Sequence, residues 1–72
     1  MTKIAIIGGG NMGGAIARGL LKGKLISPEN ISISDISENT RVGFRNLSDQ
    51  WFVTHSNQEA IKDADIIILA VK

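Results

Sequence analysis

Segments with the pattern of β-strands alternate along the 72-residue chain with segments of helical period. The strand-like segments cover residues 3–7, 31–34, 51–54 and 65–71, and the first and last are nearly continuous runs of Ile, Leu, Val and Ala. Continuous apolar runs are typical of parallel strands that are covered on both faces. The pattern therefore predicts a β-α-β-α-β-α-β chain that forms a parallel sheet with right-handed crossovers.

Two of the three helical segments begin at a capping serine. A first helix is expected over residues 11–22, a second from Ser37 to about residue 47, and a third from the S-x-x-E box at Ser56 to about residue 63. Residues 27–29 have the form of one capped helical turn with proline at its first position. Helical spacing predicts that the first helix buries Met12, Ile16, Gly19, Leu20 and Gly23, and Gly23 is the expected stop.

A glycine-rich turn joins the first strand to the first helix. Gly8, Gly10 and Gly13 follow the spacing G-x-G-x-x-G, in which the first glycine allows a sharp turn and the second lets a phosphate approach the main chain. The third glycine lets the helix pack close to the strand, and the unpaired N–H groups at the helix start face the turn. We interpret the turn as a site for a dinucleotide pyrophosphate, and glycines that serve packing alone are the alternative.

An acidic residue, Asp35, ends the second predicted strand, where a carboxylate that binds a ribose is expected in such a unit. With the glycine turn, it predicts an α/β fold with a Rossmann-type parallel sheet in the strand order 3-2-1-4. The apolar fourth strand would leave an open edge, because the chain ends just after it. We therefore expect a dinucleotide-binding domain truncated after strand 4, as the front part of a larger protein or with a partner chain covering the edge.

Composition argues against several other classes of protein. The net charge is +1 without a basic block, so nothing suggests nucleic-acid binding, and the lack of cysteine excludes disulfides and thiolate metal sites. The longest apolar run, residues 66–71, is far below the roughly 20 residues that span a membrane. We expect a cytoplasmic protein without a metal site. His55 is the one histidine and has no partners at catalytic spacing, so no catalytic residue is predicted.

Several motifs resemble those of the pyrroline-5-carboxylate reductase family. They are IIGGGNMGGAIARGLL at residues 6–21, SPENISISD at residues 27–35, Thr-x-x-Asn at residues 54–57 and ILAVK at residues 68–72. The resemblance implies reduction of the ring C=N bond of 1-pyrroline-5-carboxylate to give proline, with NADPH and sometimes NADH as hydride donor. It also implies that the groups that bind the imine, and a helical dimerisation domain, lie beyond this chain, and we expect a homo-oligomer.

The same resemblance implies where the cofactor would lie. The pyrophosphate would follow the glycine turn, the adenosine would lie near the end of the second strand and Asn57, and the last residues would run towards the nicotinamide. The candidate cofactor-binding residues are Ile7, Gly8, Gly9, Gly10, Asn11, Met12, Gly13, Ser34, Asp35, Ser37, Asn57, Ala70, Val71 and Lys72.

The preference between the two nicotinamide cofactors stays open at the level of residues. The Asp35 carboxylate would accept hydrogen bonds from ribose hydroxyls and repel a 2′-phosphate, which favours NAD. Ser34, Ser37 and Arg41 are able to hold a 2′-phosphate, unless Arg41 only lies on a solvated helix face. Because the family leans to NADPH, we predict NADP, with NAD as the alternative.

Three other functions are compatible with the same sequence. The chain would serve as a stand-alone NAD(P)-binding module, as part of another small NADP oxidoreductase of related fold, or as a structural fragment without a ligand. Binding of NADPH separates the last of these from the others, and the substrate that is reduced separates the enzymes from one another.

Overall fold

The sheet has the strand order that the sequence predicts. The computed structural model describes residues 2–71. Its strands are β1 (Ile4–Ile7), β2 (Ile31–Ser34), β3 (Phe52–Thr54) and β4 (Ile66–Leu69), which pair in parallel in the order β3-β2-β1-β4. The predicted Rossmann-type α/β fold is therefore confirmed. The ladder between β1 and β4 ends at the pair Ile7 and Leu69, because β1 turns away at Gly8, so β4 is shorter than its apolar run.

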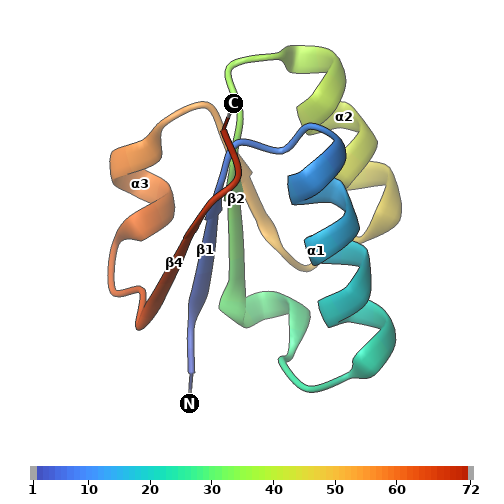
Figure 1. The fold of residues 1–72 in the computed structure, drawn as a ribbon, viewed down its shortest axis with the longest axis vertical. Coiled ribbons are helices and arrows are strands. Elements are labelled where there is room, and N and C mark those ends of the chain that lie inside the picture. The colour runs from blue at the N-terminus through green and yellow to red at the C-terminus, as the bar shows by residue number, and fades with distance from the viewer. Residues whose placement is uncertain (1, 72) are drawn as a thin grey trace.

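Helices cover both faces of this sheet. Helices α1 (Asn11–Gly23) and α2 (Glu38–Leu47) lie on one face and α3 (Asn57–Ile61) lies on the other (Figure 1). A short 3₁₀ turn, η1 (Pro28–Asn30), precedes β2. The predicted serine caps form at α2 and α3, where the Ser37 and Ser56 hydroxyls accept hydrogen bonds from the N–H groups of Thr40 and Glu59. The side chain of Ser27 makes no such bond at η1.

The core lies between the sheet and the pair α1 and α2. Ile6, Ile31 and Ile33 are completely buried in the two central strands. Phe44 of α2 meets Trp51 edge to face at a centroid distance of 5.9 Å, and the indole N–H of Trp51 donates to the Phe44 carbonyl at 2.8 Å. These contacts fasten α2 to the β3 side of the sheet and so fix the loop between β2 and α2.

The predicted buried face of α1 is wrong in part. Ile16 and Leu20 pack against the core, but Met12, Gly19 and Gly23 are exposed among the described residues. The buried positions of α1 are instead Gly13, Gly14 and Ala17. Small residues let the helix axis approach the sheet, and that close approach, rather than the size of side chains, decides which face is buried.

The predicted stop of α1 at Gly23 is confirmed to within one residue. Gly23 is the last helical residue, and Lys24 adopts the left-handed conformation that ends the helix, with φ of 55°. At the other side of the sheet, β4 leaves Ile66, Ile67 and Leu69 exposed within residues 2–71. The edge strand that the sequence predicts is therefore present, and its outer side chains lie at the surface.

Candidate functional site

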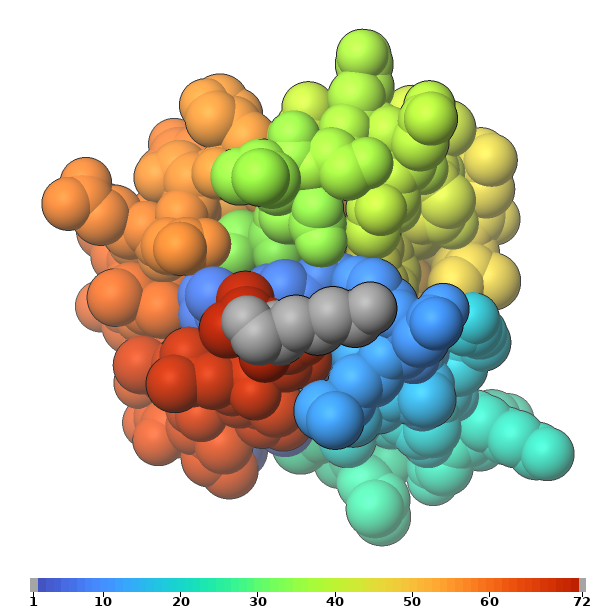
Figure 2. All heavy atoms as spheres, turned by 45° about the horizontal axis from the view of Figure 1, so that its top comes forward, coloured from blue at the N-terminus to red at the C-terminus, as the bar shows by residue number. Residues whose placement is uncertain are grey.

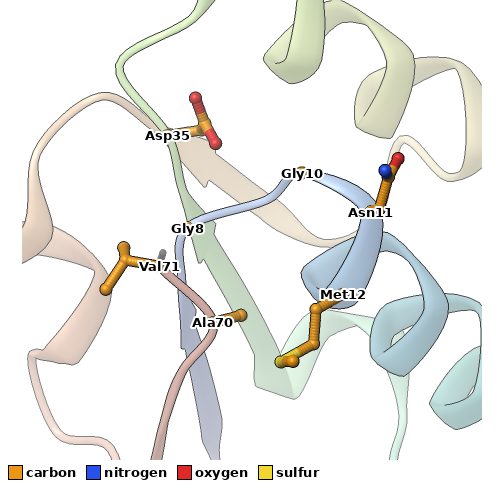
Figure 3. Close-up of a pocket in the computed structure, with 7 residues that line it drawn as sticks. All are labelled: Gly8, Gly10, Asn11, Met12, Asp35, Ala70 and Val71. Carbon is orange, nitrogen blue, oxygen red and sulfur yellow. The ribbon is translucent and has the colours of Figure 1, made fainter.

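Three segments that are distant in the sequence meet at the carboxyl ends of the strands. They are the turn between β1 and α1, the loop between β2 and α2, and the residues after β4, which lie side by side in Figure 2. Together they form a cleft of about 460 Å³ lined by Gly8, Gly10, Asn11, Met12, Asp35, Ala70 and Val71 (Figure 3). In parallel α/β sheets, ligands bind at this edge where the strand order reverses, here between β1 and β4.

The residues after β4 are held against the glycine turn. The N–H of Ala70 donates to the Ile7 carbonyl at 2.8 Å and extends the β1–β4 pairing by one bond. A Cβ on Gly8 would lie within 3.0 Å of the Val71 main-chain nitrogen, and Gly8 has φ of 92°. Gly8 therefore serves both the sharp turn and the close passage of the chain after β4.

The other glycines of the turn have different neighbours. A Cβ on Gly13 would collide with the Gly8 carbonyl oxygen, and a Cβ on Gly9 would collide with the ring of Phe44 and lie 2.8 Å from the Thr40 methyl group. Packing within the protein thus explains Gly9 and Gly13. A Cβ on Gly10 would meet nothing within 4 Å. No described neighbour requires glycine at this position, which lines the cleft.

The start of α1 faces the cleft without a protein cap. Gly10 is the N-cap residue, it offers no side chain, and the first turn carries no acidic residue. The first hydrogen bond along the helix runs from the Gly14 N–H to the Gly10 carbonyl at 2.9 Å. The N–H groups of the three residues between Gly10 and Gly14 therefore have no partner within the helix. Unpaired N–H groups and the positive end of the helix dipole make such a helix start a site for an anion.

Asp35 stands at the cleft with all its polar groups engaged. Its carboxylate accepts the N–H of Gly9 at 2.7 Å on one oxygen and the N–H of Ser37 at 2.8 Å on the other. Its own N–H donates to the Thr54 carbonyl at 3.1 Å, and its carbonyl accepts from the Arg41 guanidinium at 2.8 Å. Asp35 thereby ties the glycine turn to the loop before α2.

A smaller recess of about 150 Å³ adjoins the cleft on the side of α3. It is lined by Ile7, Gly8, Ser34, Asp35, Ile36, Asn57 and Val71. Ser34 is fully buried, and its hydroxyl donates to the Asn57 side-chain oxygen at 2.6 Å. Because the Asn57 oxygen accepts this bond, the amide nitrogen of Asn57 points away from Ser34 and remains available to donate hydrogen bonds.

Ile36 is the lining residue that sequence reasoning missed. Its side chain is 92% exposed at the rim of the recess, although isoleucine is among the residues most often buried. The available signal was one apolar residue between Asp35 and Ser37 in an otherwise polar loop.

The predicted site residues fall into three groups. The cleft and the recess together are lined by Ile7, Gly8, Gly10, Asn11, Met12, Ser34, Asp35, Asn57, Ala70 and Val71. Gly9, Gly13 and Ser37 support these residues from behind: the two glycines are buried, and Ser37 caps α2. Lys72 lies outside the described residues.

Other chemistry has little support in the described part of the chain. His55 is exposed, and residues 2–71 contain no group of three potential metal ligands. None of the helices within this range has the length and apolar character needed to cross a membrane.

Comparison with known proteins identifies the family. Residues 3–72 match the family described as "NADP oxidoreductase coenzyme F420-dependent". The chain belongs to this family. The family's description implies a nicotinamide dinucleotide cofactor for the domain.

Relatives from distant organisms carry a more specific name. Proteins named pyrroline-5-carboxylate reductase from Methanosarcina acetivorans and Corynebacterium melassecola are 37% and 36% identical over 76 and 78 residues, which is 97% and 100% of this chain. A protein of Danio rerio named pyrroline-5-carboxylate reductase 3 is 40% identical over 70 residues, 97% of this chain. The resemblance to these reductases is confirmed. The chain spans only about a quarter of their length, 26%, 26% and 24%.

Proposed function

We propose that this chain is the cofactor-binding part of an NADPH-dependent reductase that converts 1-pyrroline-5-carboxylate to proline. The names of its relatives and their similarity along nearly the whole chain support the substrate. In this proposal the chain is the N-terminal part of a dinucleotide-binding domain. The groups that bind the imine, and a helical domain that forms the homo-oligomer, belong to the remainder of the reductase.

The observation that carries the proposal is the bare main chain at Gly10. Internal packing accounts for the neighbouring Gly9 and Gly13, whereas the space beyond Gly10 is open and faces the uncapped start of α1. A pyrophosphate of a dinucleotide fits this place, because it carries negative charge and needs close access to N–H groups. When bound, the reduced nicotinamide supplies the hydride for reduction of the C=N bond.

The remaining residues are assigned by their position along the cleft. Ala70 and Val71 would follow the cofactor from the turn towards the nicotinamide, and the resemblance implies the same role for Lys72. Met12 extends from α1 towards Ala70 and would cover the apolar side of this path (Figure 3). The adenosine would occupy the recess, where the Asn57 amide nitrogen is available as a donor and Ile36 offers an apolar surface to the base.

NADP is the preferred cofactor in this proposal. The family's description names NADP, and Arg41 places a guanidinium beside the Asp35 carbonyl with further N–H donors to offer a 2′-phosphate. Arg41→Ala is expected to weaken NADPH binding more than NADH binding, since only NADPH carries the 2′-phosphate. An equal effect on the two affinities would contradict this role of Arg41.

The test uses the purified protein in its natural length. Titration with NADPH, followed by cofactor fluorescence, measures binding, and loss of NADPH absorbance on addition of 1-pyrroline-5-carboxylate measures the reaction. We expect both binding and turnover, and rescue of a proline-auxotrophic strain by the natural-length gene. Binding without turnover of this imine would exclude the substrate while leaving the cofactor site intact.

Another NADP oxidoreductase of related fold is the second candidate. The family's description, which names coenzyme F420, favours it. Transfer of reducing equivalents between NADPH and coenzyme F420, assayed with the same preparation, distinguishes the two candidates. Activity with F420 and none with the imine would favour the second.

A further inference from the structure

We propose that Asp35 is a positioning residue, which raises the affinity for the dinucleotide by bracing the glycine turn rather than by binding the adenosine ribose. The inference rests on the proposed function, since it concerns the same cofactor site. It departs from the role that a carboxylate at the end of the second strand is expected to have in a dinucleotide-binding unit.

The carboxylate of Asp35 joins two loops that carry different parts of the site. One oxygen accepts the Gly9 N–H of the β1–α1 turn, and the other accepts the Ser37 N–H just before α2. Both distances, 2.7 and 2.8 Å, are those of charge-assisted hydrogen bonds. The Arg41 guanidinium on the Asp35 carbonyl and the Asp35 N–H on Thr54 hold the residue from the other side.

Gly9 links the Asp35 carboxylate to the part of the turn that faces the cofactor. Its peptide is buried, with Phe44 and Thr40 packed where a side chain would be, so α2 presses on one side of it while Asp35 holds its N–H. The next residue is Gly10, whose open side lines the cleft. The position of the pyrophosphate-facing main chain is therefore set one peptide away from the Asp35 carboxylate, and a preorganised turn binds its ligand more tightly.

The chemistry of the ligand also disfavours a direct contact. An ionised carboxylate only accepts hydrogen bonds, and so does a doubly ionised phosphate. In a family described as NADP oxidoreductase, the 2′-phosphate would meet Asp35 as a like charge. The N–H groups of Gly9 and Ser37 offset part of the negative charge of the carboxylate. Because Asp35 then supports the turn without contacting the ribose, it can do so with either NADPH or NADH bound.

The first test is Asp35→Asn in the natural-length protein, with the affinities for NADPH and NADH measured by fluorescence titration. The Asn amide has one acceptor oxygen, so its NH₂ group must face the N–H of either Gly9 or Ser37. One of the two hydrogen bonds that position the turn is therefore lost. We expect the affinity for NADH to fall about tenfold, in the range for a charge-assisted bond. The affinity for NADPH should fall as well, but less, because loss of the Asp35 charge relieves its repulsion of the 2′-phosphate.

Asp65→Asn is the matched control. The Asp65 carboxylate also accepts a main-chain N–H, that of Lys3 at 2.8 Å, but it precedes β4 at the opposite end of the sheet. We expect unchanged affinity for both cofactors. A fall like that of Asp35→Asn would mean that general destabilisation, rather than the brace, lowers the affinity, and would overturn the inference.

The second test changes the ligand instead of the protein: it removes the 2′-hydroxyl of the adenosine ribose. It therefore tests the inference even if Asp35→Asn does not fold. Wild-type protein is titrated with NADH and with the NADH analogue whose adenosine ribose lacks the 2′-hydroxyl. If Asp35 is a positioning residue, the affinities for NADH and for the analogue should lie within about threefold of each other. If its carboxylate binds the 2′-hydroxyl, the analogue should bind about tenfold or more weakly than NADH.

Titration of Asp35→Asn with the same analogue supplies the fourth corner of a double-mutant cycle between Asp35 and the 2′-hydroxyl. A coupling factor near one supports the positioning role, and a factor of about ten or more overturns it. Wild-type protein that binds neither cofactor would instead refute the proposed function, and this inference with it. The two failures are therefore distinguishable.

Discussion

Replacement of Gly10 by alanine should affect the affinity for the cofactor much more than the stability of the fold. The added Cβ would meet nothing within 4 Å beyond its two chain neighbours, so packing against the rest of the described chain does not oppose it. Alanine is a poorer N-cap residue than glycine, which costs about 1 kcal/mol in the free energy of unfolding. The fold should therefore survive with a small loss of stability.

The effect on the cofactor should be much larger. The methyl group would stand in the cleft at the start of α1, where the pyrophosphate has to approach the free N–H groups. Loss of one charge-assisted hydrogen bond costs about 1.5–3 kcal/mol. This corresponds to a weakening of NADPH binding of about 10- to 150-fold.

The assay combines urea denaturation with fluorescence titration of NADPH on the natural-length protein. Gly19→Ala is the matched control, because Gly19 lies on the same helix, is also free of neighbours within 4 Å and lines no part of the cleft. It should gain about 0.5–1 kcal/mol of stability and bind NADPH unchanged. A folded Gly10→Ala variant with wild-type affinity would refute the reasoning about the turn.

Three further changes test the structure around the site. Gly13→Ala should lower the free energy of unfolding by about 1–3 kcal/mol, since its Cβ would collide with the Gly8 carbonyl, and unchanged stability by urea denaturation would contradict this close approach. Trp51→Phe removes the indole N–H that donates to the Phe44 carbonyl and should cost at least about 1 kcal/mol by the same assay; a smaller loss would argue against that bond. Gly43→Ala, in α2 with open space around its Cβ, should add about 0.5–1 kcal/mol, and a loss would mean that the space is needed.

The sheet was predictable because its signals are local and strong. Nearly continuous apolar runs mark β1 and β4, and the glycine spacing with Asp35 indicates the unit whose strands pair in the observed order. The end of β4 was not predictable from its own residues. The run stays apolar to Val71, but pairing stops where β1 turns at Gly8, and the sequence of β4 does not carry that information.

The buried face of α1 was mispredicted for a related reason. Helical spacing favours the larger apolar residues, and Met12 was placed in the core although it is 63% exposed and lines the cleft. The face is decided by the approach of Gly13 to the Gly8 carbonyl, which depends on the geometry of the turn rather than on hydrophobicity. Helical spacing placed Met12 in the core, whereas the family resemblance placed it among the cofactor-binding residues, and Met12 lines the cleft.

The members of the candidate site could be identified from the sequence, but the bonds between them could not. Asp35 was placed beside the glycine turn, yet nothing in the pattern indicated that both of its oxygens would accept main-chain N–H groups. Likewise, Ser34 was proposed as a ligand for phosphate, whereas its hydroxyl is buried and donates to Asn57. Such bonds depend on the distance between loops, which a single sequence does not specify.

The most direct test of the central claim is a crystal structure of the natural-length protein with NADPH bound. The account predicts that pyrophosphate oxygens lie about 2.7–3.2 Å from main-chain nitrogens at the start of α1, next to Gly10. A cofactor whose two phosphates lie elsewhere, with the N–H groups of this turn left to water, would contradict it.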